Sequence, residues 1–267
     1  MLLFFNMAVS KNILQQYAKL VNEVNQHNEL YHMLDQPKIS DYDYDQLFEK
    51  LLNFEREHPE LDVSSSPTQK TGATILAAFQ KYPHRKPMLS LSNSYDEVDL
   101  LEFHERVKKF LRSEDDVEYF AELKLDGLSM ELVYENGKLV RALTRGDGLI
   151  GEDVTHNIFT IKSIPKTIQH KGLLEVRGEV LIFKKDFAEM NVNQIELGLP
   201  EFANPRNAAA GAIRQLDSKI AASRPLKFFA YALGEYDGIT FESQEHTENV
   251  FKDLGFPILD ESLICIT

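Results

Sequence analysis

Residues 117–144, VEYFAELKLDGLSMELVYENGKLVRALT, decide the fold of this chain. Runs rich in β-branched, aromatic and leucine residues predict three strands, at 117–123, 129–134 and 138–144. The last two are joined by Asn136-Gly137, which is a strong signal for a tight hairpin turn. This stretch therefore predicts antiparallel pairing at the centre of a domain.

The segments around this stretch extend the same pattern. Further strands are expected at 174–182 and 227–233, and helices at 96–111, 185–196 and 205–215. No internal repeat is visible. The predicted fold class is α+β, with largely antiparallel sheets in the larger domain.

The N-terminal part has a different, helical period. Apolar residues recur at helical spacing from Ser10, a candidate N-cap, and this helix is expected to end before Pro37. A second helix is expected from Ser40 towards Pro59, so residues 10–58 form a helical hairpin. Residues 62–73 are small, polar and turn-forming, which places a domain boundary near residue 73.

Composition limits the classes of function. The chain has 267 residues, 43% of them hydrophobic, which is enough for a folded core. Its formal net charge of -13 gives no sign of DNA binding. Cys265 is the only cysteine, so we expect no disulfide within the chain and no metal site built on thiolates. No stretch approaches a membrane span, and we expect a soluble, cytoplasmic protein.

The chemistry is expected at Glu122-Leu123-Lys124-Leu125-Asp126-Gly127. A lysine at the end of a strand, followed by an acidic residue and a glycine that permits a tight turn, presents one amine at the mouth of a pocket. The pattern Lys-x-Asp-Gly alone is weak, and a solvated lysine beside a turn is the simpler alternative.

Companion segments make the pattern specific. They are Glu-Leu-Tyr-His (29–32), Ser-Pro-Thr-Gln-Lys-Thr-Gly (66–72), Pro-Met-Leu-Ser-Leu (87–91), Thr-Arg-Gly-Asp-Gly (144–148), Leu-Glu-Val-Arg-Gly-Glu-Val (174–180) and Ala-Asn-Pro-Arg-Asn-Ala-Ala-Ala-Gly (203–211). With these segments the chain closely resembles the bacterial NAD-dependent DNA ligases over residues 10–267. The resemblance implies a helical nicotinamide-mononucleotide-binding subdomain at 1–73 and a covalent-nucleotidyltransferase (ATP-grasp-like) domain at 74–267.

The resemblance implies that Lys124 is the nucleophile that accepts AMP from NAD. Attack requires a neutral amine, and partial burial beside cations favours that form. Arg145, Arg206 and Arg214 are the candidate cations and can also hold phosphate oxygens, although each alone could be a surface charge or part of a structural ion pair. Asp126 orients Lys124 or binds a phosphate bridged by Mg²⁺, unless it is only a turn residue.

The adenosine half of NAD has its own candidates. The resemblance assigns Glu122 to the adenine amine and Glu179 to the ribose hydroxyls, and without it both could be exposed strand charges. Ser90 and Leu91 correspond to positions that line the adenine and ribose side of the pocket. From the sequence alone they would be an ordinary loop.

The nicotinamide half is expected on the helical hairpin. A short connection around Pro37 brings the end of the first helix and the start of the second together. An aromatic face, carboxylates and an imidazole suit the pyridinium, ribose and phosphate of nicotinamide mononucleotide. Tyr44 could instead be a core residue, and the dipole alone favours acidic residues at a helix start. The candidates are Tyr31, His32, Asp41, Tyr44 and Asp45.

For the full-length family, the resemblance implies NAD and Mg²⁺ as cofactors, nicked double-stranded DNA as partner, and roles in DNA replication and repair. The chain is expected to be truncated before two further active-site lysines, and so to catalyse at most its own adenylation, with weak or no DNA binding. Two alternatives remain: an ATP-dependent nucleotidyltransferase, against which the hairpin argues, and a non-catalytic NAD-binding fragment.

Overall fold

The computed structural model describes residues 10–32, 38–39, 41–69, 79–112 and 115–266. Inside the two N-terminal helices, some side chains also lie outside the described part, namely those of Glu29, Tyr31, His32, Asp41, Tyr42 and Asp45.

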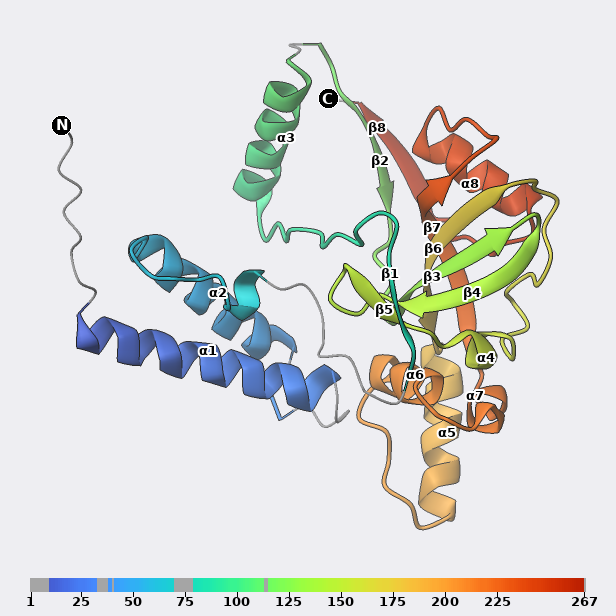
Figure 1. Cartoon of the computed structure of the whole chain (residues 1–267), viewed down its shortest axis with the longest axis horizontal. Coiled ribbons are helices and arrows are strands. Elements are labelled where there is room, and N and C mark those ends of the chain that lie inside the picture. Colours follow the sequence, from blue (N-terminus) through green and yellow to red (C-terminus); the bar gives the residue numbers. More distant parts are fainter. Residues whose placement is uncertain (1–9, 33–37, 40, 70–78, 113–114, 267) are drawn as a thin grey trace.

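The N-terminal part is the predicted helical hairpin, α1 (Lys11–His32) and α2 (Asp41–Glu57) (Figure 1). Ser10 caps α1 as expected, because its Oγ accepts a hydrogen bond from the backbone N–H of Ile13 at 3.3 Å. Buried Leu20, Val24 and Leu51 form a small core between the helices. The short 3-10 helix η1 (Pro67–Gln69) follows α2.

The second part is built on a four-stranded antiparallel sheet with the order β4-β3-β6-β7. Its strands are β3 (Leu128–Glu135), β4 (Lys138–Thr144), β6 (Leu173–Leu181) and β7 (Lys227–Tyr236). Asn136 and Gly137 link β3 to β4 with φ values of 49° and 78°. Two successive positive φ angles are what a tight hairpin turn requires, and the predicted hairpin is confirmed.

Two small antiparallel ribbons flank this sheet. β1 (Lys81–Pro83) pairs with β5 (Ile150–Glu152), and β2 (Glu118–Glu122) pairs with β8 (Ser262–Ile266). The sequence predicted β2 but not β1, β5 or β8. The partners of each ribbon are far apart along the chain, so no local turn signal marks them.

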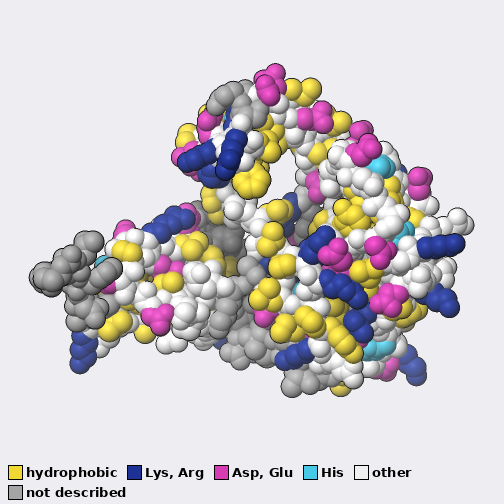
Figure 2. Space-filling model, turned by 45° about the horizontal axis from the view of Figure 1, so that its top comes forward, with side chains coloured by type: hydrophobic (Ala, Val, Ile, Leu, Met, Phe, Trp, Pro, Cys, Tyr) yellow, Lys and Arg dark blue, Asp and Glu magenta, His cyan; other side chains and the backbone are white. Residues whose placement is uncertain are grey.

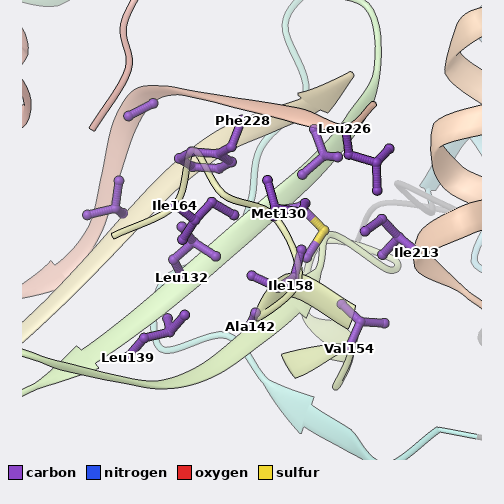
Figure 3. Packing of buried hydrophobic residues seen from close by; sticks show 14 of the residues in the cluster. Met130, Leu132, Leu139, Ala142, Val154, Ile158, Ile164, Ile213, Leu226 and Phe228 are labelled. Atoms are coloured by element: carbon purple, nitrogen blue, oxygen red, sulfur yellow. The ribbon is translucent and has the colours of Figure 1, made fainter. Parts of the chain in front are cut away.

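Helices cover the main sheet and close its core. α6 (Pro205–Ile213) contacts β3 and β6, and α8 (Gln244–Asp253) contacts β7. This part also contains α4 (Thr155–Ile158), α5 (Lys184–Glu196), α7 (Ser218–Ser223) and the exposed helix α3 (Glu97–Leu111). Figure 3 shows Met130 and Leu132 of β3 pointing into the same core as Phe228 of β7 and Ile213 of α6. This continuous core holds rigid the strands that carry the candidate site.

Helix α3 (Glu97–Leu111) contributes no buried residue. Asp96 caps it by accepting a hydrogen bond from the N–H of Asp99 at 3.0 Å. Large apolar side chains such as Leu100 and Phe110 are exposed on this helix. Figure 2 shows hydrophobic side chains around an open gap near the top of the view. None of the helices in the described ranges combines the length and the apolar character needed to cross a bilayer.

Candidate functional site

The loop between β2 and β3 carries Lys124, and the glycine at its end fixes its course. A Cβ added to Gly127 would lie 2.3 Å from the carbonyl oxygen of Val180, so only glycine allows the loop to lie this close to β6. The N–H of Gly127 donates to Oε1 of Glu179 at 3.1 Å. The Lys124 loop is therefore attached to the strand that presents Glu179.

Glu179 is the buried acid of the site, with 8% of its surface exposed. Burial raises its pKa to about 7, while the charges of Arg206 and Lys124 and the hydrogen bond from Gly127 lower it. Both cations are thus close enough to act on this carboxyl. Near neutral pH Glu179 can donate as well as accept hydrogen bonds, which suits a pair of ribose hydroxyls.

Arg206 and Asp126 face each other across the loop. Nη1 of Arg206 lies 3.1 Å from Oδ1 of Asp126, whose side chain is 67% exposed. Lys124 is also exposed. The prediction that Lys124 is partly buried is wrong, because the lysine lies on the exposed segment between β2 and β3.

Arg145 follows β4 and points to the segment before α3. Its Nη2 donates to Oγ of Ser90 at 2.6 Å. Burial lowers the pKa of Arg145, as does the charge of Arg206, whereas Tyr231 and Glu179 raise it. Nε of Arg145 is buried and has no hydrogen-bond partner among the described residues. A buried guanidinium donor without an acceptor fits an anionic ligand such as a phosphate. Leu91 is 78% exposed beside this segment.

Glu122 lies at the last position of β2 and faces α8. Burial raises the pKa of Glu122, whereas hydrogen bonds with Gln244 and Glu248 lower it by a smaller amount. Burial also raises the pKa of Glu248, and the charge of Glu122 raises it further. Two neighbouring carboxyls of this kind favour sharing a proton.

Arg214 is held differently from the other two arginines. It is the C-cap of α6, just past the helix, and not within a helix reaching residue 215 as predicted. Its Nε lies 3.1 Å from Oε2 of Glu152, and the two side chains are 13% and 0% exposed. The structure thus brings Arg145 and Arg206 near Glu179 and places Arg214 in a buried ion pair.

On the helical hairpin, Tyr44 is the one candidate with a described side chain. Its hydroxyl donates to Oδ1 of Asn28 at 2.7 Å, and its ring contacts Phe48 at a centroid distance of 6.1 Å. The Tyr44 ring therefore packs against the hairpin core, which was the structural alternative for this residue. The remaining candidates on the hairpin lie outside the described side chains: Tyr31, His32, Asp41 and Asp45.

Sequence reasoning missed Tyr231 and Ser129. Their hydroxyl oxygens lie 2.6 Å apart, and burial raises the pKa of Tyr231 to about 12, as does the charge of Glu179. Ser129 pairs directly with Glu179 across β3 and β6, a neighbour relationship that the predicted strand ranges alone do not specify. Within the described ranges, no group of three or more His, Cys, Asp or Glu side chains could hold a metal ion.

Comparisons with known proteins identify the family of the chain. The family model "NAD-dependent DNA ligase adenylation domain" matches residues 76–266, and "DNA ligase-like, N-terminal NAD+-binding domain" matches residues 10–72. The fold and the matches define a nucleotidyltransferase adenylation domain preceded by a helical NAD+-binding domain. The chain belongs to the NAD-dependent DNA ligase family.

Curated relatives named DNA ligase are similar over nearly the whole chain. The protein of Bdellovibrio bacteriovorus is 59% identical over 94% of this chain and 37% of its own length. The proteins of Petrotoga mobilis and Bacillus pumilus are 46% and 47% identical, over 94% and 91% of this chain and 38% and 36% of their own lengths. The chain thus spans little more than a third of these relatives.

Proposed function

We propose that this chain transfers AMP from NAD to its own Lys124. The observation that carries the proposal is the cluster around Glu179, where the Lys124 loop, Arg206 and the buried carboxyl act on one another. The lone pair of the Lys124 Nζ attacks the α-phosphorus and forms a P–N bond. The anhydride P–O bond breaks, nicotinamide mononucleotide leaves with that electron pair, and the nitrogen, positively charged after the attack, releases one proton to solvent.

Phosphate charge is neutralised by arginine in this proposal. The buried Nε of Arg145, which has no hydrogen-bond partner among the described residues, supplies one donor, and Arg206, 35% exposed, supplies a second cation that acts on Glu179. Donors fixed before the reaction stabilise developing charge without reorganisation. The buried ion pair with Glu152 supports the alternative for Arg214, a structural role.

Two carboxyls, Glu179 and Glu122, are proposed to bind the adenosine half of NAD. Glu179 meets the ribose hydroxyls, and Glu122, at the end of β2, meets the adenine amine. Arg145, which is proposed to hold the phosphate, also donates to Oγ of Ser90, and this contact supports binding of the adenosine next to Ser90 and the exposed Leu91. Asp126, in contact with Arg206, orients the loop that carries Lys124.

The nicotinamide half is assigned to the helical hairpin, in a domain that we place at residues 1–73, before an adenylation domain at 74–267. Tyr31, His32, Asp41, Tyr44 and Asp45 would bind it. The match of residues 10–72 to a domain described as NAD+-binding supports this assignment.

For the longer proteins of the family, the proposal continues with transfer of AMP to a 5′ phosphate at a DNA nick, in replication and repair in the cytoplasm. The names of the relatives support a ligase reaction. Among the described residues no group of three or more His, Cys, Asp or Glu side chains could hold a metal ion, and in this proposal phosphate oxygens of NAD complete the coordination of Mg²⁺.

Intact-mass spectrometry tests the proposal. The purified chain is incubated with NAD and Mg²⁺, and separately with ATP and Mg²⁺. We expect the mass increment of one AMP with NAD only, together with released nicotinamide mononucleotide. An increment with ATP only would make the chain an ATP-dependent nucleotidyltransferase, and none with either would leave a non-catalytic NAD-binding module.

A further inference from the structure

A segment that we call the strap, residues 84–90, leads from β1 to Ser90 and is held from two sides. Its backbone N–H groups at His84 and Met88 donate to the carbonyl oxygens of Leu149 and Gly148, each at 2.8 Å. From the sheet, Arg177 donates to the carbonyl oxygens of Pro87, at 3.0 Å, and Lys86. The strap is therefore fixed to the loop after Arg145 and to β6.

Under the strap lies a buried chain of charged groups. Nδ1 of His84 lies 2.8 Å from Oε1 of Glu131, and Nε of Arg177 lies 2.9 Å from Oε2 of the same carboxylate. The side chains of His84, Glu131 and Arg177 are 0%, 1% and 11% exposed. Buried charges persist only when they are paired, so this chain constrains the three elements that supply it.

The second nitrogen of His84 reaches the nucleotide site. Its Nε2 lies 3.1 Å from the backbone carbonyl oxygen of Arg145. The ring fits a closed slot, because a Cβ added to Gly151 would lie 3.0 Å from this nitrogen. His84 thus spans the distance between Glu131 and the residue whose guanidinium contacts Ser90.

Both partners of the His84 ring are acceptors. A carbonyl oxygen can only accept, and the hydrogen bonds and charges of His84 and Arg177 lower the pKa of Glu131 despite its burial, which keeps it an ionised acceptor. Each ring nitrogen of His84 therefore faces an acceptor, an arrangement that complements a ring with a proton on both nitrogens.

We propose that His84 is a positioning residue for the nucleotide site, a doubly protonated ring that links the buried Glu131–Arg177 pair to the main chain of Arg145. The link fixes the turn after β4, and so holds the Arg145 guanidinium and Ser90 where the phosphate is proposed to bind. This inference rests on the proposed function, since it assigns His84 to the reaction of Lys124 with NAD.

The ring protonation is tested without any ligand. Long-range proton–nitrogen NMR correlations of the histidine-labelled chain at neutral pH are compared with those of His84→Gln, which assigns the signals. We expect protons on both ring nitrogens of His84. His170, whose Nε2 lies 3.2 Å from the carbonyl oxygen of Leu173, serves as internal reference, because it has no carboxylate partner among the described residues. A His84 ring with one unprotonated nitrogen would overturn the link.

Kinetics test the positioning role. His84→Gln should lower the rate of AMP transfer at saturating NAD by about 10- to 100-fold, the cost of displacing a catalytic group by roughly 1 Å. The NAD concentration that gives half of the maximal rate should change little. Glu131→Gln should act in the same direction while keeping the side-chain volume. His104→Gln is the matched control, because His104 contacts Tyr119 through Nδ1 at 2.9 Å and lies outside this chain of contacts.

The outcomes separate the two proposals. A wild-type chain that accepts no AMP overturns the proposed function and, with it, the positioning role. A wild-type chain that reacts, together with folded His84→Gln protein of unchanged rate, overturns only the positioning role. A loss of rate in both buried variants but not in the His104→Gln control supports it.

Discussion

The backbone N–H of Gly127 donates a hydrogen bond to the buried carboxylate oxygen Oε1 of Glu179 at 3.1 Å. This contact joins the loop of the proposed nucleophile to β6, the strand that supplies the proposed ribose-binding carboxyl. A change at either residue should therefore affect the position of Lys124 as well as stability.

Gly127→Ala should destabilise the fold and slow AMP transfer. The new methyl group would lie 2.3 Å from the carbonyl oxygen of Val180, and overpacking of this kind typically costs about 1–3 kcal/mol. Urea unfolding and adduct formation measure the two effects. Gly198→Ala is the control, since it has φ +68° but open space, and it should lose stability without slowing AMP transfer. Equal transfer by both variants would contradict the argument.

Glu179→Gln should become more stable relative to wild type as pH rises. In the unfolded chain Glu179 loses its proton near its ordinary value of 4.5, but in the folded chain burial raises its pKa to about 7. Between these values the folded state binds more protons, so wild-type stability falls as pH rises. The full difference is on the order of 3 kcal/mol. Unfolding of both proteins at about pH 5 and about pH 8 measures it, and a pH-independent difference would refute the burial effect.

Arg206→Ala should weaken NAD and AMP binding to a similar extent, by about tenfold or more, because both ligands carry the phosphate that Arg206 is proposed to hold. Isothermal titration calorimetry measures both affinities. The substitution also frees Asp126, its partner at 3.1 Å, so Asp126→Asn is the matched control for loss of the ion pair. If Asp126→Asn weakened NAD and AMP binding to a comparable extent, the effect of Arg206→Ala would come from the lost ion pair, and Arg206 would have a structural role.

Asp45→Ala on the helical hairpin should weaken NAD binding far more than AMP binding, since only NAD carries the nicotinamide half. Tyr44→Ala should do the same but also destabilise the hairpin, because the Tyr44 ring packs in its core. Tyr44→Phe separates the effects, as it removes only the hydroxyl that donates to Asn28. Equal losses for NAD and AMP in Asp45→Ala would remove the hairpin from nicotinamide recognition.

Local patterns predicted much of the fold. Asn136-Gly137 fixed a hairpin because its conformation is encoded in two adjacent residues, and the helical period from Ser10 marked α1. The ribbons β1–β5 and β2–β8 were missed, since residues 118–122 pair with residues 262–266 through contacts that no local period records. The expected helix to residue 215 was too long, because α6 ends at Ile213 and Arg214 is its C-cap, with a side chain that contacts Glu152.

The candidate site was predictable where the motifs lie on one element, and less so where tertiary packing decides. Lys124, Asp126 and Gly127 are adjacent along the chain. The exposure of Lys124, however, depends on how the loop between β2 and β3 packs against the rest of the domain, which no local sequence pattern specifies. The link from Glu131 through His84 to Arg145 joins three distant segments, and a buried histidine or glutamate carries no sequence signal that distinguishes it from an exposed one.

The central claim is that Lys124 accepts AMP from NAD, and peptide-level mass spectrometry of wild-type and Lys124→Arg chains after incubation with NAD tests it most directly. Arginine keeps the positive charge but cannot be deprotonated to attack, so the variant should fold yet form no adduct. Thermal unfolding of both proteins provides the control for folding. The account predicts an AMP increment on the wild-type peptide that contains Lys124, and none in the variant. An increment that persists in Lys124→Arg, or that maps to another lysine, would contradict it.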